Sequence, residues 1–375
     1  MKVIVEQKLA DRAIKSVSTV IASKPVQAIM GGIRFVADGG TLSVSATNGN
    51  VDVLCNVSCD VVEPGEVVLD GKKVASMFST LPSGAVKINA DIGKPNVTIQ
   101  GVGGSKFTVA KIEGDFPERE PMNEDGVTAV EIAGGDLWTV LNTVKYAVAT
   151  EESRPVLTGV LMEIRPEGAV QCVALDGFRM GVCRRDCRVN GELAEERAII
   201  LPITAVNAIV GNCEESQTVH LYTDGTAIRA VMDGMEITAT LLAGTYADYK
   251  PIIPREWHCS ARFMVDSMSD ALKRALVISN SGKNNLVKLT VHDGSVLIES
   301  NSPTDSFSEE VPCQHSGDDM RTAYNAKYMR EVLTATRGEE MQLDLLDGLK
   351  AGVMKPVNAG RELHILLPVR VVNDA

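Results

Sequence analysis

Cysteine and histidine are the side chains of this sequence that could bind a metal or attack a substrate. Four of the eight cysteines form two pairs at a spacing of four, Cys55 with Cys59 and Cys183 with Cys187. Structural zinc sites instead use closer Cys-x-x-Cys pairs or cysteines joined by histidines. Cys313-Gln-His315 approaches such a motif but has no partner pair. We therefore predict reduced thiols packed as small apolar side chains, with no metal and no cofactor.

Two further residue pairs are candidates for acid–base catalysis, Asp176 with Arg179 and His258 with Cys259. A catalytic site also needs a third residue that orients the nucleophile and its base, and none recurs at a usable spacing. The Asp-Gly of the first pair reads equally as a hairpin turn. The glycines at 101–104 lie between predicted strands rather than before a helix, so they make a poor phosphate-binding loop. The sequence therefore predicts no enzyme.

Lysine and arginine remain as possible contacts for phosphate groups. The formal net charge of −12 argues against nucleic-acid binding unless the cations gather on one surface. Along several predicted helices cations recur three or four residues apart, which places them on one helix face. A solvated helix surface gives the same pattern, but its recurrence in equivalent helices favours a surface that neutralises phosphates without reading bases. The cations expected there are Lys8, Arg12, Lys15, Lys24, Lys72, Lys73, Lys145, Arg154, Lys273, Arg274, Lys327, Arg330 and Arg337.

The elements that carry these cations belong to a repeat of roughly 125 residues that occurs three times. Each copy contains twice a helix followed by alternating strands, as the second halves at 67–117, 198–249 and 322–369 show best. Helices are predicted at 9–21, 136–148 and 268–278 in the first halves, and Leu9, Ala13, Val17 and Val20 are expected to form the apolar side of the first. Short turns between the strands indicate antiparallel pairs.

This pattern predicts an α+β protein of three domains, each with two helices backing antiparallel sheets. Proline-rich and charged connectors place the domains at 1–125, 126–253 and 254–375. No apolar run approaches the roughly 18 residues that would span a bilayer. The first residues do not read as a signal peptide, so we expect a cytoplasmic protein.

Four short segments in this order resemble the bacterial sliding clamps, the beta subunits of DNA polymerase III. They are Leu157-Thr158-Gly159, Ala174–Met180, Gly244–Tyr249 and Leu366–Arg370. Each is weak by itself, but their order and spacing within a triple repeat are specific. The resemblance covers essentially the whole chain.

The resemblance implies DNA-clamp domains joined head to tail in a closed, two-chain ring, with helices lining the hole and sheets forming the outer wall. Cations would then face the enclosed duplex and acids would face outward. At the subunit boundary it places Phe107 and Val109 of the first domain against Val277 and Ile278 of the partner's third domain. Closing the sheets there covers edge strands that would otherwise be exposed.

The resemblance also implies a pocket between the second and third domains that binds partner peptides. Its mostly aliphatic wall suits an extended peptide carrying leucine and an aromatic anchor. The residues carried over are Leu157, Leu175, Gly177, Phe178, Arg179, Met180, Ala247, Ile252, Ile365, Leu366, Pro368, Val369 and Arg370.

The chain departs from the family pattern at several of these positions. Phe178 stands where histidine is usual and Ala247 where proline is usual, which alters the expected pocket depth and peptide preference. The chain runs on as Val372–Ala375 beyond the usual end, and the stretch after Arg154 lacks the tyrosines that some members point at DNA.

We therefore expect a homodimeric, non-catalytic clamp. Its expected partners are duplex DNA, bound without sequence preference, the catalytic subunit of polymerase III, a clamp loader, and other replication and repair proteins. Two alternatives are an enzyme and a ring-forming adaptor that does not bind DNA. An adaptor has no need for the aligned cations, and salt-sensitive DNA association would separate it from a clamp.

Overall fold

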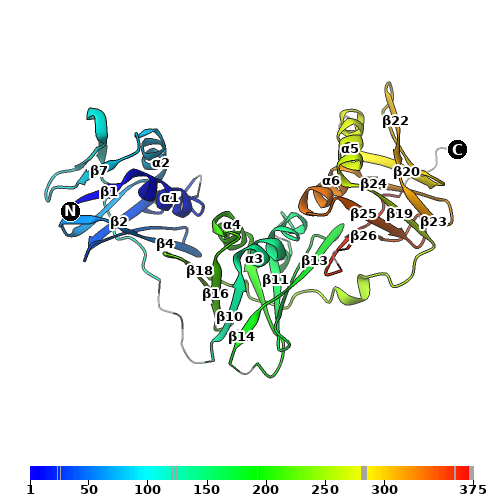
Figure 1. Cartoon of the computed structure of the whole chain (residues 1–375), viewed down its shortest axis with the longest axis horizontal. Coiled ribbons are helices and arrows are strands. Elements are labelled where there is room, and N and C mark those ends of the chain that lie inside the picture. Colours follow the sequence, from blue (N-terminus) through cyan, green and yellow to red (C-terminus); the bar gives the residue numbers. More distant parts are fainter. Residues whose placement is uncertain are drawn as a thin grey trace. The chain divides into compact units, whose positions relative to one another are not determined.

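The computed structural model describes residues 1–22, 24–25, 27–119, 122, 126–151, 153–191, 193–279, 285–358 and 360–370. Its contacts divide the chain into two compact units (Figure 1). Unit 1 comprises Met1–Trp138, Cys187–Ala194 and Leu201–Leu242, and unit 2 comprises Thr139–Asp186, Glu195–Ile200 and Ala243–Ala375. The C-terminal residues 372–375, which run beyond the usual end of the family, lie outside the described residues.

Strand, helix and further strands follow one another six times, two times in each repeat. The first repeat holds β1 (Lys2–Glu6), α1 (Gln7–Ser18), η1 (Ala28–Gly31), β2 (Gly32–Asp38), β3 (Thr41–Thr47), β4 (Val51–Ser58), β5 (Asp60–Glu63), β6 (Gly65–Asp70), α2 (Gly71–Thr80), β7 (Ala85–Asn89), β8 (Asn96–Gln100), η2 (Val102–Gly104) and β9 (Lys106–Ala110).

The middle repeat holds β10 (Thr128–Ala133), α3 (Gly134–Asn142), η3 (Lys145–Ala147), η4 (Pro155–Thr158), β11 (Gly159–Arg165), β12 (Ala169–Leu175), β13 (Arg179–Asp186), β14 (Arg188–Asn190), β15 (Arg197–Pro202), α4 (Ile203–Asn212), β16 (Thr218–Thr223), β17 (Ala227–Met232), β18 (Met235–Thr240) and η5 (Lys250–Ile252).

The last repeat holds β19 (Cys259–Met264), α5 (Val265–Ser279), β20 (Leu286–His292), β21 (Ser295–Asn301), β22 (Ser306–Pro312), β23 (Gln314–Gly317), β24 (Met320–Asn325), α6 (Ala326–Ala335), β25 (Glu340–Leu345), β26 (Gly352–Pro356) and β27 (Glu362–Leu366). The predicted α+β class with antiparallel sheets is confirmed, and each repeat carries its two α-helices.

Sheets continue from one repeat into the next. In unit 1 a nine-stranded sheet runs β14-β10-β16-β17-β18-β4-β3-β2-β6, and in unit 2 another runs β15-β11-β12-β13-β27-β26-β25-β19-β23. We call the antiparallel β4–β18 pair the first junction and the β13–β27 pair the second junction. Two smaller sheets end on β9 and β22, in the orders β5-β1-β7-β8-β9 and β22-β21-β20-β24.

Two helix predictions need correction. The predicted helix at 136–148 ends at Asn142 and gives way to the short η3, and α1 ends at Ser18 rather than at 21. Leu9 was expected on the apolar side of α1, but 48% of it is exposed. The buried side is instead Ala10, Ala13, Ile14 and Val17, which follow the three- and four-residue spacing of one helix face.

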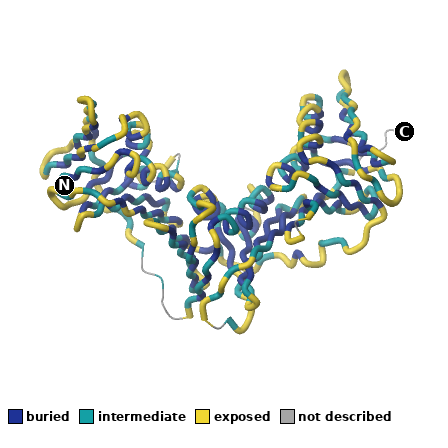
Figure 2. The backbone as a smooth tube through the Cα atoms, viewed as in Figure 1, coloured by how far each residue is buried: buried dark blue, intermediate teal, exposed yellow. Residues whose placement is uncertain are grey.

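The cores lie where the helices pack on the sheets. Along the strands buried residues alternate with more exposed ones, as in Val51–Ser58, and Figure 2 shows the buried residues concentrated inside each unit. In unit 2 the core joins Met268 and Leu272 of α5, Val332 and Leu333 of α6, and Leu343 of β25. None of the helices in the described part of the chain is both long and apolar enough to cross a bilayer.

Candidate functional site

Most of the expected peptide-pocket residues surround the second junction. Leu175 pairs with Met180 across the β12–β13 turn, and β13 then pairs with β27, with Arg179 opposite Leu366 and Met180 opposite Ile365. The amide of Leu367 donates to the carbonyl of Phe178 at 2.8 Å, which continues this pairing beyond β27. The turn between β12 and β13 passes through Gly177, whose φ of +91° is a conformation that favours glycine.

The remaining pocket residues come from segments beside these strands. The amide of Leu175 donates to the hydroxyl of Tyr246, next to Ala247, at 3.2 Å. A Cβ on Gly244 would lie 2.7 Å from Val156, the neighbour of Leu157. The C-terminal segment is held by the amide of Val369, which donates to Ala323 at 2.8 Å. Ile252 lies on η5, and the described contacts do not tie it to the rest of the set.

The expected pocket residues differ sharply in exposure. Five of them form the buried floor rather than an accessible wall, namely Leu157, Leu175, Met180, Ile365 and Leu366. Phe178 is 61% exposed and Ile252 44% exposed, and Ala247 and Arg370 are also exposed. Phe178 therefore stands exposed beside a buried aliphatic floor.

Arg179 is enclosed rather than open to a ligand. Its Nε donates to Asp176 at 3.0 Å, its Nη1 is ion-paired with Glu331 of α6, and only 10% of the side chain is exposed. The guanidinium also lies 4.2 Å from the ring centroid of Tyr328 and 5.2 Å from that of Tyr146. Two carboxylates and two aromatic rings therefore fix this arginine between β13 and α6.

A buried polar chain lies next to Arg179. The Tyr146 hydroxyl is 2.9 Å from Nδ1 of His364 and 3.2 Å from the Met180 carbonyl oxygen, and His364 Nε2 is 3.0 Å from Glu362. His364 is fully buried. Burial raises the pKa of Tyr146 well above its usual range, so its phenol stays neutral. Because every member has a partner, the chain can be buried without a large desolvation cost.

The expected DNA-facing cations lie on or near the helices and most are exposed. Three of them are already neutralised, Arg12 by Glu214, Lys15 by Asp11 at 2.6 Å and Arg274 by Glu309 at 2.5 Å. The first of these pairs joins residues 202 positions apart, which no helix pattern could reveal.

Five of the expected cations depart from the simple picture of an exposed helix face, and one of them, the exposed Arg154, directly precedes η4. Lys145 is half-buried, and burial lowers its pKa. Arg330 is half-buried, whereas Lys24 and Arg337 are exposed but lie outside the helices.

The expected subunit-boundary residues lie at the two sheet ends. Phe107 and Val109 are on β9, the last strand of its sheet, and Val109 is buried while Phe107 is half-buried. Phe107 lines a shallow cavity of about 400 Å³ together with residues of α2. Val277, near the end of α5, is 75% exposed. Phe107 is therefore a partly accessible apolar group on an open strand edge, and Val277 is an exposed one on α5.

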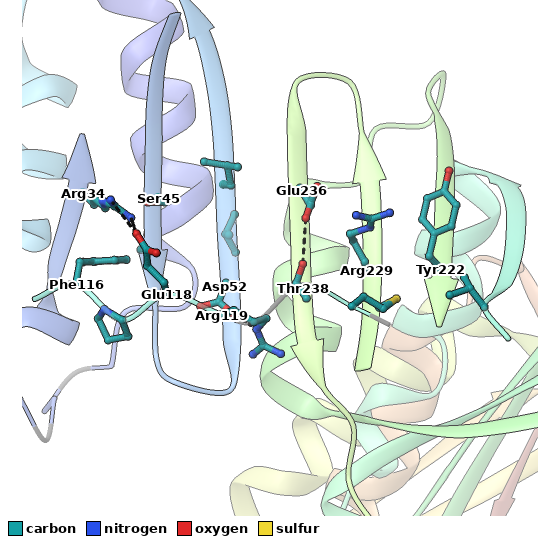
Figure 3. Close-up of a pocket in the computed structure, with 16 residues that line it drawn as sticks. Arg34, Ser45, Asp52, Phe116, Glu118, Arg119, Tyr222, Arg229, Glu236 and Thr238 are labelled. Carbon is teal, nitrogen blue, oxygen red and sulfur yellow. Dashed lines mark hydrogen bonds and ion pairs between the residues drawn. The ribbon is translucent and has the colours of Figure 1, made fainter. Parts of the chain in front are cut away.

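A cavity of about 640 Å³ was not predicted from the sequence. It lies in unit 1, on the face of the nine-stranded sheet away from α1, and spans the first junction (Figure 3). Its polar groups come from six strands (β2, β3, β4, β16, β17 and β18) and from the segment after β9, so only the fold assembles them. No cluster of three or more metal-ligating side chains occurs among the residues that the structure describes.

Three domain families match the chain in succession. They are the N-terminal, central and C-terminal domains of the DNA polymerase III beta subunit, over residues 1–119, 131–248 and 250–370. The "Beta sliding clamp" of Halalkalibacterium halodurans is 26% identical, with 99% of this chain and 100% of the relative aligned. That of Proteus mirabilis is 23% identical over the same shares.

Solved structures agree with these matches. The DNA polymerase III beta subunit of Thermotoga maritima has a TM-score of 0.89 at 23% identity, covering 99% of this chain and all of that one. A sliding clamp of Pseudomonas aeruginosa bound to griselimycin has the same TM-score at 22% identity and the same coverage.

Proposed function

The chain belongs to the DNA polymerase III beta subunit family of bacterial sliding clamps, and we propose that two copies close a ring around duplex DNA and tether the replicative polymerase there. The clamp has no catalytic role. It raises the local concentration of the bound polymerase, and processivity follows from enclosure rather than from tight contacts. We propose three domains, at 1–125, 126–253 and 254–375.

The observation that carries this proposal is a junction that one chain cannot complete. Val53 pairs with Ile237 at the first junction and Gly181 with His364 at the second. In the described part of the chain the three repeats form two such junctions, and β9 and β22 are left as sheet ends. A second copy of the chain supplies the missing partner for each end.

The repeat also predicts the register of this third junction. On one side of each junction, the strand pairs with the seven-residue strand before it at that strand's sixth residue. The pairs are Val53 with Ala46, Gly181 with Ala174 and Phe307 with Ser300. On the other side, Ile237, His364 and Phe107 each pair with a buried residue of the strand before them, namely Ala230, Met354 and Ile99.

We therefore propose that Phe107 lies opposite Phe307 of the partner subunit. The register that pairs Val51 with Ala239 then brings Val109 opposite Asp305 of the partner subunit. Cross-strand aromatic pairs are favourable. The charges also complement one another, since β9 carries Lys106 whereas β22 carries Glu309 and Glu310.

Helix packing supports the same closure. Helix α1 contacts α4 beside the first junction, and α6 contacts η3 beside the second. The corresponding pair at the third junction is α5 with the partner's α2. Because α5 packs on β22, its exposed Val277 and neighbouring Ile278 would meet that helix beside Phe107.

Contact with DNA is assigned to the helix cations. In unit 1 these are carried by α1 and α2, which pack on each other, and in unit 2 by α5 and α6, which do the same. The exposed Lys8, Lys73, Lys273 and Lys327 make no ion pair with any described residue and can neutralise phosphates without a competing carboxylate. Such contacts carry no sequence information, so the ring can slide.

Partner peptides are assigned to the surface around the second junction. The exposed Phe178 and Ile252, the buried aliphatic floor and the C-terminal segment suit an extended peptide with leucine and aromatic anchors. The polymerase catalytic subunit, the clamp loader and other replication and repair proteins are the proposed ligands. Because Arg179 is already paired, we assign it to shaping this surface rather than to binding a free carboxylate.

The test is retention on nicked circular DNA compared with the same DNA linearised, after loading by a matched clamp loader with ATP. Retention on the circle and loss from the cut ends is the expected result. Equal loss from both would contradict enclosure and favour the adaptor without DNA. Neutralising Lys8, Lys73, Lys273 and Lys327 together should weaken loading in a salt-dependent way, because fewer phosphate contacts release fewer counterions.

A further inference from the structure

The cavity on the first junction has the size and the floor of a ligand site. Its volume of about 640 Å³ falls within the roughly 300–1,000 Å³ of small-ligand pockets. Strand register sets four floor residues in one line across the sheet, because Asp52 pairs with Thr238, Thr238 with Arg229, and Arg229 with Tyr222. Figure 3 shows these side chains on successive strands with the segment Phe116–Arg119 beside them.

Two of the three arginines in the cavity hold its wall in place. Arg34 is paired with Glu66 at 2.8 Å and with Glu118 at 3.3 Å, and lies over the Phe116 ring. Arg119 is ion-paired with Asp52, and it donates to the Asn50 carbonyl at 2.7 Å and to the Thr240 hydroxyl at 3.0 Å. Both guanidinium groups are therefore occupied in fixing the segment after β9 to the sheet.

The third arginine, Arg229, differs. Its guanidinium lies 4.9 Å from the Tyr222 ring centroid, and it forms no ion pair with any residue that the structure describes. Its Nε is buried and has no hydrogen-bond partner there. Glu236, the nearest acid on the neighbouring strand, instead accepts from the Thr238 hydroxyl at 3.3 Å. A half-buried cation with open donors on an aromatic platform is suited to an incoming carboxylate.

The second junction shows that these polar groups are not needed to join the sheets. The positions that correspond to Asp52 and Thr238 are Met180 and Ile365, which pair in the same register and are buried. The first junction therefore keeps an accessible arginine, a tyrosine and a cavity where an apolar surface would suffice. Apolar lining from Val127, Met122 and Phe116 adds a place for an aliphatic side chain.

We propose that this cavity is a second docking site, separate from the surface at the second junction, for a partner segment in which an acidic residue is flanked by aliphatic ones. The carboxylate bonds to Arg229, and an aliphatic neighbour packs on Tyr222 and Val127. The two sites lie on different junctions, so one clamp subunit holds two different partner segments at once.

The test uses the full-length protein with methyl-¹³C methionine and the peptide acetyl-Ala-Leu-Asp-Leu-Ala-amide, with Asn and Lys versions as matched probes. The Asp peptide should shift the Met122 methyl signal while Met180, at the second junction, stays unchanged. The Asn peptide should bind about tenfold or more weakly, since a charge-assisted hydrogen bond contributes about 1.5–3 kcal/mol, and the Lys peptide should not bind.

Variants then separate the site from general charge effects. Arg229→Met should abolish the preference for Asp over Asn, and Tyr222→Leu should weaken both peptides, whereas Arg321→Met, at an exposed arginine of unit 2, should change neither. Retention of Arg229→Met on circular DNA should remain as in the unchanged protein. Equal affinity for Asp and Asn, a shift at Met180 instead of Met122, or no binding at millimolar peptide would each overturn the proposal.

Discussion

The two junctions join their strands in one register but differ on the helix-facing side. At the first junction this side carries Val51 and Ile237, whereas the same places at the second carry Arg179 and His364. The facing helices differ in the same way. The third and sixth residues are Ala205 and Ala208 in α4, but Tyr328 and Glu331 in α6. Apolar side chains are therefore enough to hold two repeats together.

The opposite faces reverse this contrast, with polar side chains at the first junction and apolar ones at the second. Each junction thus carries polar groups on one face only. The polar groups at the second junction are buried and hydrogen-bonded, whereas those at the first junction are half-buried and line a cavity. The repeat acts as an internal control that separates what closes a sheet from what recognises a ligand.

The largest effect is expected at the third junction, between two chains. Phe107→Asp would place a carboxylate in the aromatic pair with Phe307 of the partner subunit, and it would do so at both interfaces of the ring. We expect the dimer dissociation constant to rise roughly 100-fold or more, measured by analytical ultracentrifugation. Ile92→Asp, at a fully exposed turn of the same sheet, is the control. An unchanged dimer dissociation constant would contradict the proposed pairing of Phe107 with Phe307 of the partner subunit.

The next effect concerns the buried chain at the second junction. His364→Ile installs the residue of the first junction. It removes the hydrogen-bond partner of Glu362 and one of the two partners of the Tyr146 hydroxyl, which keeps only the Met180 carbonyl. We expect a loss of about 3 kcal/mol in unfolding free energy, measured in urea at fixed protein concentration. The reciprocal Ile237→His should also destabilise the protein, because the first junction offers no hydrogen-bonded tyrosine and glutamate to satisfy a buried imidazole. If either exchange were neutral, the two junctions would be interchangeable.

A smaller loss is expected from Gly181→Ala. A Cβ at this position would lie 3.1 Å from the Val144 backbone and 3.4 Å from the Tyr146 ring, whereas the first junction accommodates Val53 in the same place. Overpacking of this kind costs about 1–3 kcal/mol. Gly360→Ala, which meets nothing within 4 Å, should leave the urea midpoint unchanged. If the urea midpoint of Gly181→Ala equalled that of the control, the segment at Val144–Tyr146 would be able to move and accommodate the added methyl group without cost.

Thiol labelling can compare how readily the junctions open. Cys55 and Cys183 occupy the same place in the two junctions, and burial raises the pKa of each to about 11. Only the thiolate reacts, so at pH 8 both should resist iodoacetamide until the strands separate, and labelling should speed up as the pH rises toward 11. We expect Cys183 to react roughly tenfold more slowly, because the Arg179 ion pairs add about 1.4 kcal/mol against opening. Mass spectrometry of the labelled peptides measures this, and faster labelling of Cys183 would reverse the ranking.

The smallest effect is expected for Arg119→Met. Its ion pair with Asp52 is partly exposed, so the loss in unfolding free energy should be about 1 kcal/mol or less. The local consequence should be clearer, since the segment it fixes would be cut faster by chymotrypsin at Phe116. Arg188→Met, at an exposed arginine of β14, should leave the cleavage rate unchanged. Equal cleavage in both variants would show that Arg119 does not hold the wall.

Local pattern was sufficient to predict the repeated elements. Helix α2 follows from the Asp70 cap and the Val74–Phe78 spacing, and hairpins follow from Asp-Gly and Asn-Gly turns. The break after Asn142 could not be predicted, because Tyr146 leaves the helix to reach His364, 218 residues away. Tertiary hydrogen bonding outweighed a helix-like sequence there.

The candidate sites were predictable only as far as the resemblance reached. It predicted a pocket from the segments around Phe178 and Leu366. It could not predict that Arg179 would be enclosed, because Glu331 comes from a helix 152 residues later. No sequence motif predicted the cavity at Arg229. Its line of side chains exists only once four strands adopt their register, and register is a property of paired strands rather than of one stretch of sequence.

The strand ends β9 and β22 have a consequence for assembly. Because the two ends are different surfaces, each chain adds to another in one direction, and pairing them sets no limit to the number of chains. A fibre and a closed ring would use the same strand-to-strand hydrogen bonds. Opening one interface of the ring would therefore expose the edges of β9 and β22. A free subunit in solution would then compete with the ring's own second edge for pairing with each of them.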